Sequence, residues 1–497
     1  AEKHKLSELK PSEVFITNDP YRGAQHLPDI FVFSPIFSGD RLIAFGASAA
    51  HHLDVGGAAA ASLNPSATEI YAEGFLIPAI KTELPDAFNS GLFPELFAAN
   101  VRVPKLTIGD LNAQLAANHT CRTRLLALVD KYGLDVVLDC MQALIDYCER
   151  RTREEIAKIP DGTYPAVEMM DNSVFSKEPI EIHTKVTVRG SNVFIDFAGT
   201  SPQVAGPINA PFTATVSAVY TAVHAILTGE EIPANAGCYR PIKVNVPYGS
   251  LLNPSPPTAV RARVNTCLRV MDSIFRAFAT VLPERVTASG FHASTLIAMS
   301  NNSGNEVEVF TDPVNSGFGG SSRNDGESQC GNPISNCKNT PVEAIETDYN
   351  FLRIKSYALV PDTAGAGKHR GSMGVRRDFE IFEDNVKWHT FSDRHQHRPW
   401  GLFGGQDGTL GRIVVTRDGD EIVLGPVSSF ELRRGDVVSV INGGGGGYGD
   451  PHERDRALVL KDLAEERISA EKAAEIYGLT GSEGLEIQNK EERRERK

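Results

Sequence analysis

The chain has 497 residues, of which 41% are hydrophobic and 23% are charged, and these proportions are typical of a globular protein of two to four domains. Its net charge of −13 argues against non-specific nucleic-acid binding, because such binding needs faces rich in lysine and arginine. An acidic lipid surface is an equally poor partner. No run approaches the roughly 18 consecutive apolar residues of a membrane span.

Seven cysteines are scattered through the chain, and none of them forms a CxxC pair. This usage is typical of a protein kept in a reducing compartment. The chain also opens without the charged and apolar regions of a signal peptide. We therefore expect a cytoplasmic protein.

The first part of the chain, 1–105, is expected to be rich in strands. Apolar runs alternate with glycine and proline turns between residues 12 and 80, and residues 38–40 separate two of these runs as a hairpin turn would. Region 106–162 is expected to form a helical hairpin, because residues such as Leu111 and Leu115 recur at helical spacing and Gly133 interrupts the pattern.

Region 163–345 is expected to mix strands and helices around a substrate. Period-2 patterns on both sides of residues 189–192 predict a second hairpin, and residues 207–231 and 267–281 have the composition of helices. A long loop follows, in which residues 300–345 are mostly Gly, Asn, Ser, Asp and Cys. Long ordered loops of this kind often carry function.

Region 346–455 is expected to be all β, as a barrel or a sandwich, because its strand-like runs are separated by Asp/Gly turns. Region 456–497 is expected to hold one terminal helix, 457–477, and a charged tail. The sequence as a whole thus predicts an α+β fold with mixed β-sheets, a helical pair and a C-terminal all-β region.

The strongest chemical signal lies between residues 18 and 57. His26 and Asp29 are three residues apart, and His51, His52 and Asp54 follow after one predicted hairpin. Imidazole nitrogens and carboxylate oxygens are ligands for zinc, manganese and ferrous iron. Two adjacent strands could bring these groups to one end of a sheet. The same residues also fit a polar turn and a hydrogen-bonded strand end that bind no metal.

Other motifs give weaker signals. In the sequence GAGKHRGS (365–372), His369 follows the Lys where a phosphate-binding loop has Ser or Thr. We interpret the glycine run 443–447 as a close approach of backbones. No GxSxG motif occurs. Cys267 fits a buried thiol better than an activated thiolate. The cluster Arg394, His395 and His397 fits either a carboxylate-binding site or an exposed loop at a sheet rim.

The chain also contains a series of longer motifs, which in order are NDPYRGAQHLPD, AHHLDVGG, NPSATEIYAEGFLIP, LNAQLAANHTCRTRL, GPINAP, LNPSPP, KNTPVEAIE, GAGKHRGSMGVRRDF, RPWGLFGG and GGGGGYGDP. Together they resemble the hydantoinase B family over nearly the whole chain. This family includes the smaller subunit of ATP-dependent N-methylhydantoinases, the C-terminal half of 5-oxoprolinase, caprolactamase-type lactamases, and subunits of acetone and acetophenone carboxylases.

The resemblance implies a hydantoinase A-like partner that binds ATP and phosphorylates a carbonyl oxygen of the substrate. The B-type subunit then completes the reaction at a divalent metal centre, with zinc, manganese or iron as the metal. It implies that His26, Asp29 and His51 are ligands, joined by an upstream Asp for which this chain has no matching residue. His52 or Asp54 would orient a ligand or act as a base. A hetero-oligomer such as α2β2 is expected.

The function that follows is the B-type subunit of an ATP-dependent ring-opening amidohydrolase, acting on a hydantoin, a lactam or a 5-oxoproline-like ring. Amide resonance opposes attack on such rings, and phosphorylation of the oxygen removes that resonance. The absence of a phosphate loop is expected if the partner binds ATP. The alternatives are a subunit of an ATP-dependent ketone carboxylase and a non-catalytic structural paralogue in such a complex.

Overall fold

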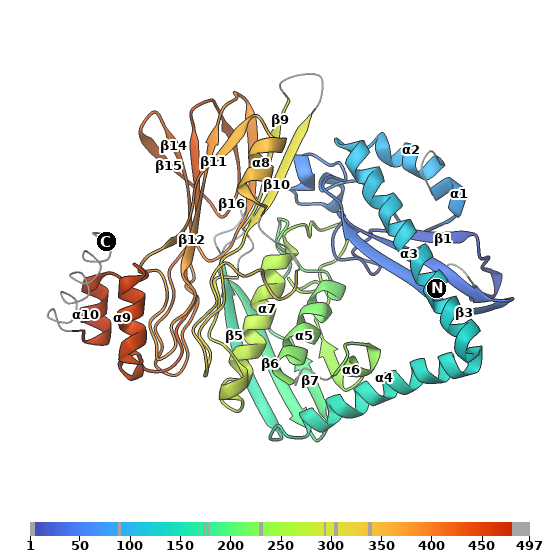
Figure 1. Ribbon diagram of the computed structural model, residues 1–497, viewed down its shortest axis with the longest axis horizontal. Coiled ribbons are helices and arrows are strands. Elements are labelled where there is room, and N and C mark those ends of the chain that lie inside the picture. Colours follow the sequence, from blue (N-terminus) through green and yellow to red (C-terminus); the bar gives the residue numbers. More distant parts are fainter. Residues whose placement is uncertain are drawn as a thin grey trace, which may run out of the picture.

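The computed structural model describes residues 5–479 except for 88–90, 172–174, 176–177, 228–231, 293–294, 303–306 and 336–339. The expected charged tail, EIQNKEERRERK at 486–497, and part of the expected long loop therefore lie outside the described residues. Within them the strands form four sheets, and helices cover two of these sheets (Figure 1). The predicted α+β fold with a strand-rich C-terminal region is confirmed.

The N-terminal region is an antiparallel sheet in the order β3-β2-β1-β4. The predicted hairpin is confirmed, since the two long strands pair from Asp29↔His51 to Ser38↔Arg41 and the turn contains Gly39 at a φ of 57°. Short helices follow the sheet. The elements of this region are β1 (Glu13–Thr17), β2 (Asp29–Ser38), β3 (Arg41–His51), β4 (Ile80–Glu83), α1 (Leu84–Ala87) and α2 (Leu92–Ala98).

The helical pair is present as α3 (Pro104–Tyr132) and α4 (Leu134–Ile156), but the two helices do not form the expected antiparallel hairpin. Figure 1 shows α4 leaving α3 at a steep angle. The physical reason is that the helices bury their apolar residues in different cores. Leu111 and Leu115 of α3 join the core of the N-terminal sheet, whereas Ile156 of α4 joins the core of the next layer. Helical periodicity cannot tell which core a helix will cover.

That next layer is a four-stranded sheet with helices packed on it. The predicted second hairpin is confirmed by the pair Arg189↔Asn192. The helix α7 packs on β5, β6 and α5 (Figure 1). The elements are β5 (Gly162–Met170), β6 (Ile180–Arg189), β7 (Asn192–Asp196), β8 (Ile242–Asn245), α5 (Phe212–Leu227), α6 (Ala236–Tyr239) and α7 (Arg263–Phe278).

The C-terminal region is a β-sandwich whose two sheets share one apolar core that includes Phe379 and Trp388. One sheet, in the order β10-β9-β13-β16, takes two strands from before residue 346, so the sandwich begins earlier than the expected all-β region. It consists of β9 (Thr295–Asn301), β10 (Glu308–Val314), β13 (Val386–Phe391) and β16 (Val427–Leu432). The other consists of β11 (Leu352–Val360), β12 (Gly374–Ile381), β14 (Arg412–Arg417), β15 (Asp420–Leu424) and β17 (Val437–Asn442), with α8 (Val342–Asp348) before it.

The glycine run beyond β17 packs directly against other backbone segments, as interpreted from the sequence. A Cβ atom on Gly371 would lie 1.9 Å from the carbonyl oxygen of Gly445, and one on Gly447 would lie 2.0 Å from that of Ala366. Side chains have no room at these positions. The run is therefore a layer of close backbone packing.

The described part of the chain ends with two helices, α9 (Arg456–Ala464) and α10 (Ala470–Tyr477), where the sequence predicts one. Glu466 between them has a φ of 54°, which a helix cannot accommodate, and the Ser469 side chain accepts the Lys472 N–H as a new N-cap. The local capping chemistry overrides the continuous helical pattern.

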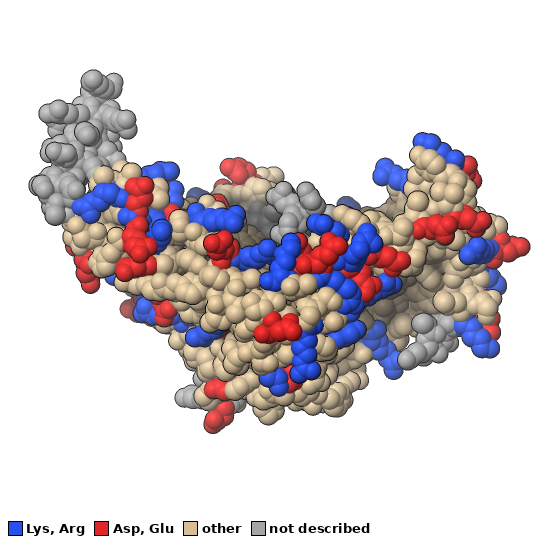
Figure 2. Space-filling view, turned by 90° about the horizontal axis from the view of Figure 1, so that it is seen from below, with Lys and Arg blue, Asp and Glu red and all other residues tan. Residues whose placement is uncertain are grey.

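Figure 2 shows Lys and Arg interspersed with Asp and Glu over the face in view. Among the described helices, none combines the length and the apolar character that crossing a bilayer requires.

Candidate metal centre

The register of one hairpin places two of the predicted ligands side by side. Asp29 is the first residue of β2 and His51 is the last residue of β3, and the two residues are direct partners in the ladder. Their side chains therefore point to the same face of the sheet. His26 lies in the turn just before β2. One potential ligand atom from each of the three residues lies within 4.8 Å of the others.

The contacts within this group centre on the carboxylate. Asp29 Oδ2 lies 2.9 Å from His26 Nδ1, and Asp29 Oδ1 lies 3.2 Å from His51 Nδ1. The two imidazole rings stack with their centroids 5.0 Å apart. His26 Nδ1 is buried, and despite its closeness to the carboxylate it makes no aligned hydrogen bond. A buried nitrogen without a hydrogen bond, facing a carboxylate, is an arrangement that a shared cation would satisfy.

The electrostatics favour the protonation states that metal ligands need. Burial and the charge of Arg263 hold the pKa of His26 well below its ordinary 6.5, and burial also lowers the pKa of His51. Burial opposes ionisation of Asp29, but the two histidines and Arg263 outweigh that cost and hold its pKa well below 3.8. Two neutral imidazoles and one ionised carboxylate are thus available at neutral pH. This donor set fits zinc, manganese or iron.

The three residues open into a cavity of about 320 Å³, at the small end of the range for ligand pockets. Three parts of the chain meet there: the N-terminal sheet, the start of α7, and the sandwich with the loop between its strand β10 and α8. The residues that line it are Gln25, His26, Asp29, Phe31, Ala49, His51, Arg261, Arg263, Val264, Cys267, Leu296, Ile334 and Ser335. The wall is mostly apolar, and its charged groups are concentrated beside the three donors.

Two of these residues, Arg261 and Arg263, were not singled out from the sequence. The available signal is the segment VRARV at 260–264, which places two arginines in an apolar run directly before a helix. Cys267 also lines the cavity, and burial raises the pKa of its thiol to about 12. It is therefore a neutral buried thiol, as interpreted from the sequence.

A family model described as Hydantoinase B/oxoprolinase matches residues 1–451. The chain belongs to this family. It is 35% identical over 490 residues to the B chain of a putative D-/L-hydantoinase from a Pseudomonas species, with 96% of this chain and 82% of that protein covered.

Solved structures agree with this family. The crystal structure of ATP-dependent caprolactamase from Pseudomonas jessenii superposes with a TM-score of 0.88 at 29% identity, over 96% of this chain and 84% of the other. The nucleotide-free structure of acetone carboxylase superposes with a TM-score of 0.86 over 97% of this chain and 72% of the other. This chain and acetone carboxylase are only 18% identical in sequence, so this similarity establishes a shared fold alone.

The remaining two candidates, His52 and Asp54, belong neither to the three converging donors nor to the described residues that line the cavity, so a role for them at the metal remains a prediction. Neighbouring residues of a strand point to opposite faces, so His52 points away from His51 toward α3. There its Nε2 lies 3.0 Å from Gln114 Oε1. Asp54 is fully buried and pairs with Arg102 at 3.0 Å. Both residues instead fix the loop that follows β3.

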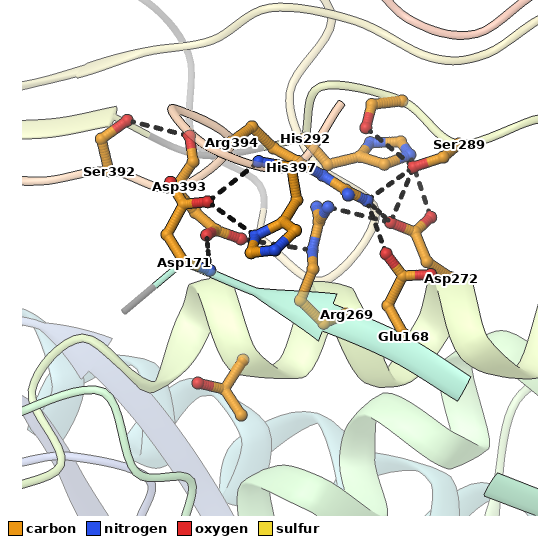
Figure 3. A network of polar contacts seen from close by, with 12 residues as sticks. Glu168, Asp171, Arg269, Asp272, Ser289, His292, Ser392, Asp393, Arg394 and His397 are labelled. Carbon is orange, nitrogen blue, oxygen red and sulfur yellow. Dashed lines mark hydrogen bonds and ion pairs between the residues drawn. The ribbon is translucent and has the colours of Figure 1, made fainter. Parts of the chain in front are cut away.

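A second cluster of charged residues lies in the centre of the molecule (Figure 3). Arg394 is 1% exposed, and its Nη2 lies 2.9 Å from Asp272 Oδ2 and 3.1 Å from Glu168 Oε1. Arg269 pairs with Asp272 at 3.3 Å and with Asp393 at 3.5 Å.

Asp171 completes this cluster by accepting the main-chain N–H groups of His395 and His397 at 2.6 and 3.2 Å. The sequence cluster of Arg394, His395 and His397 thus binds carboxylates, but these carboxylates belong to the protein itself. It is a buried cross-connection between β5, α7 and the segment after β13.

Proposed function

We propose that this chain is the B-type subunit of an ATP-dependent ring-opening amidohydrolase. Its substrate would be a hydantoin, a lactam or a 5-oxoproline-like ring whose carbonyl oxygen an A-type partner has phosphorylated. The observation that carries the proposal is the convergence of His26, Asp29 and His51 on one small cavity. The related hydantoinase and caprolactamase support the choice of cyclic amides.

His26, Asp29 and His51 would hold the divalent metal. When bound, such a metal lowers the pKa of a water molecule toward 7 and polarises oxygen atoms, which favours hydrolysis near neutral pH. The chain's own residues do the rest. The carboxylate of Asp29 keeps both imidazoles in place, and Phe31, Val264 and Leu296 provide an apolar wall for a small ring. A volume of about 320 Å³ favours a single ring over a larger substrate.

The division of labour follows from what the sequence lacks. It contains no phosphate-binding loop, so ATP would bind to the A-type partner. The related protein of the Pseudomonas species is described as a subunit, which agrees with a hetero-oligomer such as α2β2. Phosphorylation by the partner removes the amide resonance before the ring reaches the cavity.

The test uses the complex of the chain with its A-type partner and a panel of hydantoins, lactams and 5-oxoproline. We expect at least one ring to stimulate ATP consumption and to be opened in the same assay. In the His51→Ala complex, ATP consumption should persist while ring opening is lost, because phosphorylation occurs in the partner. The exposed His119 on α3 provides the matched control, and His119→Ala should retain both activities.

Two results would contradict the proposal. One is consumption of a ketone that depends on bicarbonate, with no ring opened, since this is carboxylase chemistry. The other is unchanged ring opening in the His51→Ala complex, since the cavity would then play no part in the reaction.

A further inference from the structure

The cavity has a cationic side that the three donors do not explain. Arg261 and Arg263 both line it. Arg261 is 3% exposed, and the side chain of Arg263 is 11% exposed. Among the described lining residues Asp29 is the one carboxylate, so the two guanidinium groups outnumber the carboxylates. The lining therefore carries a net positive charge before any metal binds. A divalent metal would increase that excess, and an enclosed excess of charge favours binding of an anion.

The position of Arg263 is set by the site itself. Its Nη2 lies 3.1 Å from Asp29 Oδ2 and 3.3 Å from Gln25 Oε1. It is the first residue of α7, so the positive end of a helix of 16 residues lies at the same side of the cavity. Arg263 thus reaches the metal ligand Asp29 and faces the space beside it.

The main chain that carries Arg261 is held rigidly. The buried carboxylate of Glu73 accepts the N–H groups of Val260 and Arg261 at 2.9 and 2.8 Å. The hydroxyl of Tyr21 donates to the carbonyl of Thr258 at 2.5 Å. Glu73 therefore fixes the backbone at Arg261, whose Nη2 donates to the carbonyl of Ala61 at 3.4 Å and whose side chain lines the cavity.

We infer that Arg261 and Arg263 form a phosphate clamp in the metal cavity. The clamp binds the phosphoryl group of the activated substrate and places the attached ring carbon beside His26, Asp29 and His51. A planar guanidinium with forked N–H donors matches phosphate oxygens. The arginines make and break no bond; they are positioning residues. This inference rests on the proposed function, because it requires a phosphorylated ring.

The test measures binding of inorganic phosphate to the metal-loaded full chain by calorimetry. Arg261→Gln should weaken the affinity for phosphate by roughly tenfold or more, as expected for loss of a charge-assisted pair. Arg261→Lys keeps the charge but not the fork, and should fall between wild type and Arg261→Gln. Metal content and the thermal midpoint are measured for each variant, so that a folding defect is recognised. The control is Arg412→Gln, which changes a half-exposed arginine on β14 and should leave the affinity unchanged.

Because Arg263 contacts Asp29, its variants need a second measurement. Arg263→Lys should retain the metal and weaken phosphate binding, whereas Arg263→Gln should lower both. If phosphate binds equally well to wild type and Arg261→Gln with full metal content, the clamp is wrong. The same conclusion follows if wild type binds no phosphate, or if binding depends on the metal and on neither arginine.

These outcomes separate the clamp from the proposed function. If the complex opens cyclic amides but substitution of Arg261 or Arg263 leaves its phosphate affinity unchanged, the proposed function stands and the clamp is wrong. If the complex opens no ring but binds phosphate in a way that depends on Arg261, the proposed function is wrong and the cavity is an anion-binding site.

Discussion

Two regions of this molecule gather His, Asp and Arg side chains, and they differ in what those side chains face. Around His26 the groups lie at the end of a hairpin and open into a cavity. Around Arg394 the groups lie in the interior, where guanidinium and carboxylate groups face one another (Figure 3). The first arrangement presents its donors to a ligand, whereas the second pairs its charges internally.

This difference shows that residue type alone does not distinguish a reactive site from a structural one. Both clusters contain residues that can bind metals or anions. What separates them is access to a cavity. Substitutions that change one cluster at a time should therefore affect either function or stability.

The largest effect should come from the donors in the cavity. His26→Ala removes one of two imidazoles, and we expect loss of bound metal and a fall in ring opening by at least about 10³-fold, since metal catalysis supplies several kcal/mol. Elemental analysis and turnover of the purified complex check this. Retention of one equivalent of metal by His26→Ala would remove this residue from the ligand set.

The next largest effect should be on stability, in the interior cluster. Arg394→Met leaves Asp272 and Glu168 without their shared partner, and we expect a loss of roughly 3 to 5 kcal/mol in the free energy of unfolding. Urea denaturation measures it. The control Arg412→Met removes a half-exposed pair with Glu421 and should cost less than about 1 kcal/mol. Equal effects of the two variants would mean that the interior network has no special role.

A smaller effect should appear in the pH dependence of stability. Burial lowers the pKa of His292 from 6.5 to about 3, so the folded protein does not take up the proton that the unfolded chain binds near pH 6.5. The stability is complete above that pH and is lost as the pH falls toward 3. At pH 5, His292 alone lowers the free energy of unfolding by about 2 kcal/mol relative to its value above pH 6.5. His292→Asn should flatten the loss measured by urea denaturation between pH 6.5 and 5, and an unchanged slope would contradict the assignment.

The smallest effect should come from His52, which lies outside the cavity and contacts Gln114 of α3. His52→Gln disturbs the contact with Gln114, and we expect a loss of about 1 to 2 kcal/mol in the free energy of unfolding. Metal content should not change, and ring opening should stay within a few-fold of wild type. A loss of ring opening as large as that of His26→Ala would restore the original expectation for His52.

The two clusters also show what sequence reasoning could reach. The hairpin was predictable from the turn at Gly39, but the direct pairing of Asp29 with His51 was not, because a bulge between Ile36 and Phe37 shifts the register by one residue. His52 and Asp54 were assigned by proximity along the chain, and strand alternation sends His52 to the opposite face. The direction of α4 depends on a core that periodicity does not reveal.

The interior network could not be predicted, because its members are far apart in the sequence. Asp171 and His397 are separated by 226 positions, and only the tertiary fold brings them together. The same holds for the cavity wall, where Arg261 and Arg263 reach the donors from the start of α7. Local patterns predict a ligand pair on one hairpin, whereas the groups around that pair depend on packing between regions.

The most direct test of the central claim is an anomalous-scattering map from a crystal of the metal-loaded chain. We predict one strong peak bound by a nitrogen from each of His26 and His51 and by an oxygen of Asp29. A peak elsewhere in the molecule, or no peak at this cavity in protein shown to bind one equivalent of metal, would contradict the account.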